Sequence, residues 1–232
     1  MSFQKSTYPH SKVYQQFKEI QFANHRELVR FFESNKAAIF ATDLMEYFEL
    51  LVAYASALFE IGRYEDYLNI ADEVIEFSIA HNIKFFKGED VYQKFLFKKA
   101  AAYYNLMSYG QSEYILKELI KMNPNDELVI QFLKKCKSKK TPKFLHTSRA
   151  ASIFLFIFAG GIIAVEILFI RNFMPTLTQG TELLRNCIFA FGILLLVGAE
   201  LAHRYRIYRQ THQFVKKHRK IKAQSRAEKI SA

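Results

Sequence analysis

The sequence comprises 232 residues, of which half are apolar and 24% are charged, with four Pro, eight Gly and two Cys. This balance excludes a disordered or collagen-like chain and favours helices. Cys136 and Cys187 are too few for a disulfide framework and lack the spacing of zinc ligands. Residues 1–133 carry 14 Lys/Arg and 18 Asp/Glu, whereas residues 134–232 carry 19 Lys/Arg and 4 Asp/Glu. Because the basic excess flanks the two most apolar runs, it indicates membrane topology before nucleic-acid binding.

The N-terminal segment has no apolar run long enough for a signal peptide, so we expect the N-terminus to stay in the cytosol. Apolar residues then recur every three to four positions, the period of amphipathic helices, and no alternating strand pattern of useful length is present. The predicted helices cover residues 11–24, 25–35, 43–61, 64–81, 89–107, 110–122 and 125–138. We therefore predict an all-α cytosolic domain over residues 1–140.

One stretch of this domain combines small, aromatic and proline positions at an informative spacing. Ala100 and Tyr103 lie in one predicted helix, Tyr109 opens the next, and Pro124 follows that helix. The pattern resembles the tetratricopeptide repeat (TPR), with Met107 in place of the usual turn glycine. The resemblance implies two antiparallel helices packed as one repeat unit.

A weaker copy of the same pattern comes earlier in the chain. Gly62 and Tyr64 form a Gly-x-Tyr turn, although Tyr67 stands where a small residue is expected. The resemblance to tetratricopeptide proteins covers residues 43–138 and implies a solenoid of helix pairs with a concave groove. Such proteins serve mostly as protein-interaction scaffolds and perform no chemistry themselves. An unrelated helical bundle is the alternative.

The resemblance also implies which side chains would line the groove. The later groove helix would present Lys94, Lys98 and Asn105, and the earlier one would present Glu49 and Phe59. The earlier set lacks the Lys and Asn with which the family binds a peptide carboxylate, so this mode of binding is not supported. Lys94 and Lys98 lie one turn apart, and they either meet an acidic partner segment or form a solvated pair.

Two apolar runs follow the helical domain. Residues 150–170 contain Glu166 as their one acidic residue, and residues 186–202 contain Glu200. The first run is about 30 Å long as a helix, which matches the hydrocarbon core of a bilayer. Each run lacks the polar face of a soluble helix, so we predict two membrane spans.

The segment between the runs is short and contains Pro175 and Gly180 as turn formers, which predicts an antiparallel transmembrane hairpin over residues 141–205. Residues 134–149, before the first run, hold seven Lys/Arg and residues 204–222, after the second, hold eight, whereas the connecting segment holds only Arg171 and Arg185. The positive-inside rule then places both termini in the cytoplasm. A bacterial inner membrane is the expected location.

Acidic residues within spans are candidate functional sites. Glu166 can pair with Arg185 across the hairpin, and Glu200 precedes His203 and Arg204 by one turn. Three interpretations are open for these acids: structural anchoring, helix contacts within an oligomer, and ion or proton passage. Because the two acids belong to opposite ends of the hairpin, they are not expected to form one ion site.

Residues 206–232 form a basic tail that can continue the second span as a helix. Ile207, Phe214 and Ile221 recur every seven residues among Lys, Arg, His and Gln. The pattern favours an amphipathic helix on the anionic inner leaflet. A short coiled coil between copies is a second interpretation. Nucleic-acid binding has no recognised fold behind it.

Motifs of enzymes are absent from the sequence: there is no phosphate-binding loop, dinucleotide fingerprint, zinc-protease motif or nucleophile elbow. We therefore expect no catalytic residue, metal or cofactor. The predicted function is that of a membrane-anchored TPR-like adaptor that binds a protein partner at the cytoplasmic face, with anionic lipids as a second partner, no nucleic acid, and self-association left open. The alternative is an oligomeric membrane effector or channel component gated by its cytosolic helical domain.

Overall fold

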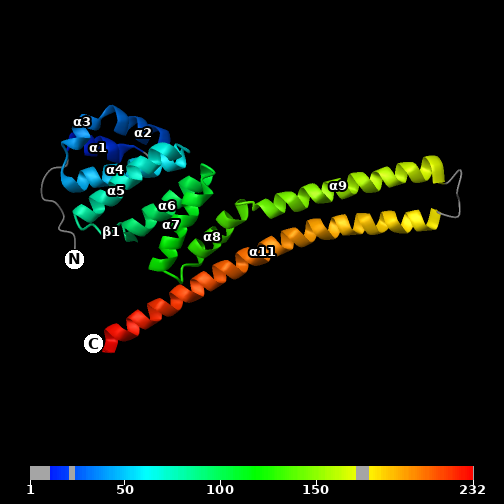
Figure 1. The fold of residues 1–232 in the computed structure, drawn as a ribbon. Helices are drawn as coiled ribbons and strands as arrows, with labels where there is room; N and C mark the ends of the chain where they lie inside the picture. Colours follow the sequence, from blue (N-terminus) through cyan, green and yellow to red (C-terminus); the bar gives the residue numbers. More distant parts are fainter. Residues whose placement is uncertain (1–10, 21–23, 171–177, 232) are drawn as a thin grey trace. The chain divides into compact units, whose positions relative to one another are not determined.

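The computed structural model describes residues 11–20, 24–170 and 178–231 (Figure 1). Apart from one pair of two-residue strands, these residues form helices and their connections. The chain divides into two compact units, Met1–Val129 and Ile130–Ala232. The first unit contains α1 (Lys12–Glu19), α2 (His25–Ser34), α3 (Lys36–Phe40), α4 (Leu44–Glu60), α5 (Tyr64–Ala80), β1 (Phe85–Phe86), β2 (Glu89–Asp90), α6 (Val91–Asn105) and α7 (Tyr109–Met122). Helix α8 (Glu127–Lys139) crosses the division, and the second unit continues with α9 (Lys143–Val165), the π-helical turn η1 (Glu166–Ile170) and α11 (Thr178–Ser231).

The predicted helices of the first 140 residues agree with the structure to within a few residues, but the structure adds two short elements. Helix α3 follows α2 directly, and the antiparallel strands β1 and β2 precede α6. The strands are joined by Lys87 and Gly88, whose φ angles of 52° and 84° are those of a tight hairpin turn. A pair of two-residue strands is too short to produce an alternating pattern, so the sequence did not predict it.

Helix α4 ends in a Schellman cap built on a glycine. Gly62 has a φ of 82°, in the left-handed region that glycine tolerates best. The Arg63 amide donates to the Leu58 carbonyl at 3.0 Å, and the Gly62 amide donates to the Phe59 carbonyl at 3.1 Å. The cap reverses the chain so that α5 begins at Tyr64, two residues after the glycine.

Helix α6 ends in the same cap, although the residue in the left-handed region is not glycine. Met107 has a φ of 59°. The Ser108 amide donates to the Tyr103 carbonyl at 2.9 Å, and the Met107 amide donates to the Tyr104 carbonyl at 3.0 Å. Helix α7 then begins at Tyr109, again two residues later. The pairs α4–α5 and α6–α7 therefore share one turn geometry.

Replacing Met107 by glycine is expected to stabilise the first unit by about 1 kcal/mol, because a side chain is strained at positive φ. The Met107 side chain is 75% exposed and loses little packing when removed. Hydrogen exchange of α6 amides, read by mass spectrometry on the full chain, should slow in the variant. Gly62→Ala, the reciprocal change in α4, should speed exchange there; slower exchange in that variant would contradict the strain argument.

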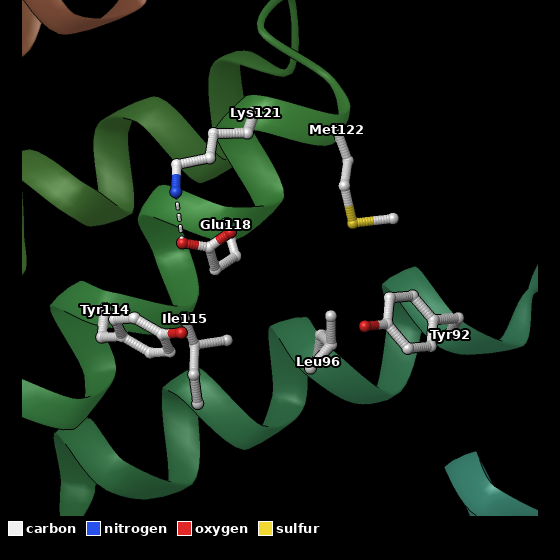
Figure 2. Close-up of a pocket in the computed structure, with 7 residues that line it drawn as sticks. All are labelled: Tyr92, Leu96, Tyr114, Ile115, Glu118, Lys121 and Met122. Atoms are coloured by element: carbon white, nitrogen blue, oxygen red, sulfur yellow. Dashed lines mark hydrogen bonds and ion pairs between the residues drawn. The ribbon is translucent and has the colours of Figure 1, made fainter.

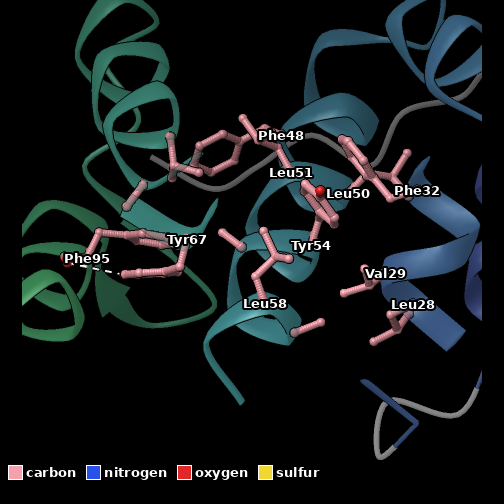
Figure 3. Packing of buried hydrophobic residues seen from close by; sticks show 14 of the residues in the cluster. Leu28, Val29, Phe32, Phe48, Leu50, Leu51, Tyr54, Leu58, Tyr67 and Phe95 are labelled. Atoms are coloured by element: carbon pink, nitrogen blue, oxygen red, sulfur yellow. Dashed lines mark hydrogen bonds between the residues drawn. The ribbon is translucent and has the colours of Figure 1, made fainter. Parts of the chain in front are cut away.

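The core of the first unit is a cluster of apolar side chains from α1 through α6 (Figure 3). Phe32 and Tyr54 stack with ring centroids 4.1 Å apart and hold α2 against α4. Tyr67 of α5 is fully buried; its ring lies 5.2 Å from that of Phe59 and 6.4 Å from that of Phe95. Its hydroxyl donates to the Phe95 carbonyl at 3.3 Å. A large aromatic residue therefore fills the contact between α4, α5 and α6.

In the second unit, α9 and α11 pack against each other in opposite directions. The rings of Phe156 and Phe189 lie 5.2 Å apart. A Cβ added to Gly192 would lie 2.8 Å from the Phe156 ring, so the glycine allows this close approach. Gly180, predicted as a turn former, lies instead in the first turn of α11. The other predicted turn former, Pro175, lies outside the described residues.

Two helices of the second unit are long and apolar enough to cross a membrane. The qualifying stretches are Lys143–Leu168 and Gln179–Ser225. Most of their apolar side chains face outward; Ile157 and Leu194, for example, are 69% and 68% exposed. Helices that expose such residues are typical of membrane spans rather than of a soluble core.

The basic tail continues α11 without a break, but its apolar residues are not all exposed to solvent. Ile207 and Val215 are 8% and 6% exposed, whereas Ile221 is 47% exposed. On the same stretch, the ring of Tyr208 lies 5.3 Å from Lys134 Nζ of α8. Of the predicted heptad of Ile207, Phe214 and Ile221, the first residue is therefore covered within the protein and the last is exposed, and the contact of this face with lipid or with a second copy stays a prediction.

Candidate functional site

Of the predicted groove residues, the structure brings Lys98 of α6 and Phe59 of α4 into contact. Lys98 Nζ of α6 lies 5.0 Å from the ring centroid of Phe59 and 3.4 Å from a carboxylate oxygen of Glu60, both of α4. The Lys98 side chain is only 22% exposed, so its aliphatic part covers the ring while its charge is paired. We call this patch, together with Lys94 and Asn105, the α4–α6 surface.

The other basic residue of the α4–α6 surface is also paired within the chain. Lys94 forms an ion pair with Glu89 of β2. The two lysines therefore each have an acidic partner, and the surface carries no net charge from these four groups. Asn105, at the end of α6, is exposed and makes no side-chain hydrogen bond to the part of the chain that the structure describes. The α4–α6 surface thus presents an aromatic ring, aliphatic chains, an amide and two internally paired lysines.

The far end of the same face of α4 is occupied by the protein itself. The Glu49 carboxylate accepts hydrogen bonds from the Tyr14 hydroxyl at 2.6 Å, from Lys18 Nζ at 2.7 Å and from Lys87 Nζ at 2.8 Å. Burial alone would raise the pKa of Glu49, but these three donors outweigh it and lower the pKa to about 2. Helix α1 and the β1–β2 turn are thereby fastened to α4, so Glu49 is not available to a partner.

A separate pocket of about 530 Å³ opens between α6 and α7 (Figure 2). Its apolar lining comes from Tyr92 and Leu96 of α6 and from Met122 of α7, and the Glu118–Lys121 ion pair, at 2.6 Å, forms its polar edge. Lys94 is two positions from both Tyr92 and Leu96, and residues at this spacing point to opposite sides of a helix. The pocket and Lys94 therefore lie on different faces of α6.

Glu166 and Glu200, the acids within the two apolar runs, each pair with a basic residue of the other helix. Glu166 Oε2 accepts from Arg185 Nη1 at 3.0 Å, and the Glu166 side chain is only 8% exposed. Near the other end of the helix pair, Glu200 Oε2 accepts from Arg149 Nη2 at 3.3 Å. The predicted pairing of Glu166 with Arg185 is thus present, whereas Arg149 was not foreseen as the partner of Glu200.

The residues next to Glu200 complete a small cluster at the interface between α9 and α11. Arg204 Nε lies 3.5 Å from Glu200 Oε1, so two guanidinium groups reach one carboxylate. His203, on the same face, is 7% exposed, its ring lies 6.1 Å from that of Phe144, and its Nε2 makes no hydrogen bond to the described residues. We refer to Arg149, Glu200, His203 and Arg204 as the interfacial cluster.

Among the residues that the structure describes, no group of three or more His, Cys, Asp or Glu lies close enough to hold a metal ion. The described part of the chain thus offers binding surfaces and ion pairs as its candidate sites. Comparison with family models, with curated proteins and with solved structures finds no match to this chain.

Proposed function

We propose that the protein is a membrane-anchored adaptor, in which α9 and α11 form a two-span hairpin and the first unit binds a protein partner at the cytoplasmic face. The observation that carries the proposal is the contrast between a well-packed helical unit and two long helices whose apolar side chains face outward. Membrane confinement would raise the effective concentration of the unit for partners at the same surface. The Lys/Arg distribution supports cytoplasmic termini, and a bacterial inner membrane is the location we favour.

The first unit is proposed to be TPR-like because two of its helix pairs repeat one local geometry. Gly62 and Met107 hold equivalent left-handed caps, and each is followed after one residue by a tyrosine that starts the next helix. Under this proposal α4 and α6 line the groove, and the α4–α6 surface is the recognition site.

The channel alternative receives less support from the ion pairs. An acid that conducts ions or protons must face a water-filled path. Glu166 instead accepts from Arg185, and Glu200 accepts from Arg149 and Arg204, all within one chain. These contacts favour a structural role for both acids, which is what an anchor requires.

A position-specific crosslink tests the adaptor function. A photo-crosslinking amino acid is placed at Asn105, on the α4–α6 surface, or at Glu76, on the exposed side of α5. Crosslinking in native membranes should give a discrete adduct from Asn105 but not from Glu76. When the membranes are then washed with carbonate, the protein should stay in the pellet. Phe59→Ala should weaken that adduct because it removes the exposed part of the aromatic contact. Release by carbonate, or equal adducts from both positions, would contradict the proposal.

A further inference from the structure

The spacing of charges along α9 and α11 indicates the depth of the interfacial cluster. No charged residue occurs in residues 150–165 or 186–199. At about 1.5 Å per residue, the steps from Arg149 to Glu166 and from Arg185 to Glu200 rise about 25 Å and about 22 Å. This band is slightly shorter than the roughly 30 Å hydrocarbon core, so each ion pair lies at the edge of that core. An arginine side chain at this depth extends to the level of the lipid phosphates.

The two arginines of the cluster have most of their hydrogen-bonding capacity left. Each guanidinium carries five N–H donors, and each uses one of them on Glu200. The side chains of Arg149 and Arg204 are 49% and 74% exposed. Two guanidinium groups and one carboxylate give the cluster a net positive charge, and the carboxylate holds both guanidinium groups in place. The planar N–H donors of a guanidinium group match the oxygens of a phosphate.

His203 adds an unsatisfied polar atom to the same face. It lies one turn from Glu200 on α11, it is more than nine-tenths buried, and its Nε2 has no hydrogen-bond partner among the described residues. A buried ring nitrogen without a partner is costly and is normally satisfied by a ligand or by water. A phosphate oxygen held by the two arginines would supply an acceptor at this level.

We propose that Arg149, His203 and Arg204 form a binding site for the phosphate headgroup of an anionic phospholipid at the end of the spans where α9 begins. The inference deepens the proposed function and rests on it, because the phosphate level is defined only if α9 and α11 span a bilayer. It assigns the lipid contact to the interfacial cluster rather than to the distal tail. Lys216 and Lys217 lie about 18–20 Å further along the continuous helix α11, beyond about two Debye lengths at physiological salt.

The test uses the full chain in nanodiscs of phosphatidylcholine that contain phosphatidylglycerol as a minor component. Lipids that remain bound after release from the discs are counted by native mass spectrometry. Wild-type protein is expected to retain phosphatidylglycerol about tenfold over its share in the disc. Arg149→Gln/Arg204→Gln should abolish this preference. Lys216→Gln/Lys217→Gln removes the same charge from the distal tail and should keep the preference within about twofold. Equal losses in both variants would show a general charge effect and overturn the site.

A single variant and a competition with inorganic phosphate complete the test of the lipid site. If the double variant does not accumulate, Arg204→Gln alone takes its place, because Arg204 is mostly exposed and its replacement should leave the fold intact. This single variant should lower the preference for phosphatidylglycerol about threefold. Inorganic phosphate at millimolar concentration should not displace the lipid; displacement would mean that a soluble phosphate is the ligand and would overturn the lipid assignment. A chain that stays in carbonate-washed membranes but shows no lipid preference refutes this site alone, whereas release by carbonate refutes the anchor itself.

Discussion

Reversing the charge of Arg185 is expected to destabilise the second unit by about 3–5 kcal/mol, because Arg185→Glu would leave two carboxylates facing each other beside apolar side chains. Glu166, the present partner of Arg185, has almost no exposure through which water could compensate. The measurement is the unfolding free energy of the full chain in mild detergent micelles titrated with sodium dodecyl sulfate. The variant should also accumulate poorly in membranes, since two acids without a basic partner at this depth hinder insertion.

The control restores the ion pair with the acidic and basic residues exchanged. Glu166→Arg/Arg185→Glu should regain most of the lost stability, because the contact joins the same two positions with the charges exchanged. Glu182→Gln changes an exposed acid three residues away and should shift the unfolding free energy by less than about 0.5 kcal/mol. If the exchanged pair were as unstable as Arg185→Glu, the ion pair would not be what joins α9 to α11. Glu166 would then return as a candidate for ion passage.

The helical part of the fold was predictable because amphipathic helices have apolar residues at a regular spacing of three to four positions. Amphipathic spacing located α1, α2 and α4–α8, and the two apolar runs indicated α9 and α11. Short elements show no such spacing, which is why α3 and the β1–β2 pair were missed. Met107 was noted as a departure from the repeat pattern, but only the backbone shows that it adopts the glycine conformation.

The candidate sites were predictable only in part, since their ion pairs join residues far apart in the chain. Lys98 contacts Glu60 across 38 residues, and Arg149 contacts Glu200 across 51. Sequence spacing indicated that Lys98 lies on an exposed face but could not indicate that its charge is already matched. The sequence therefore left open an acidic partner segment or a solvated pair for Lys94 and Lys98, whereas the structure pairs each lysine with an acid of the chain itself. The pairing of Glu166 with Arg185 was accessible because an antiparallel hairpin fixes which ends of the two spans meet.

Replacing Glu49 by glutamine is expected to lower the stability of the first unit by about 2 kcal/mol at neutral pH, with a pH dependence that identifies the cause. The three donors hold the pKa of Glu49 at about 2, below its ordinary value of 4.5. A carboxyl group with a lowered pKa stabilises the fold above its unfolded-state pKa. This contribution is lost as the pH falls from about 4.5 toward 2. The wild type should therefore lose stability across this window, while Glu49→Gln should show a smaller change.

Native-state hydrogen exchange of α4 amides on the full chain measures this difference locally. Glu76→Gln, an exposed change on α5, serves as the matched control and should leave the pH profile of α4 unaltered. Lys87→Gln removes one of the three donors and should reproduce part of the effect, because the Glu49 carboxylate then keeps only Tyr14 and Lys18. A profile for Glu49→Gln that runs parallel to that of the wild type from pH 5 to pH 2 would exclude Glu49 as the origin. Helix α1 would then be held against α4 by its buried Tyr14 and Phe17 and by the hydrogen bond that the Ser11 hydroxyl donates to Glu46 at 2.6 Å, without a contribution from the charge of Glu49.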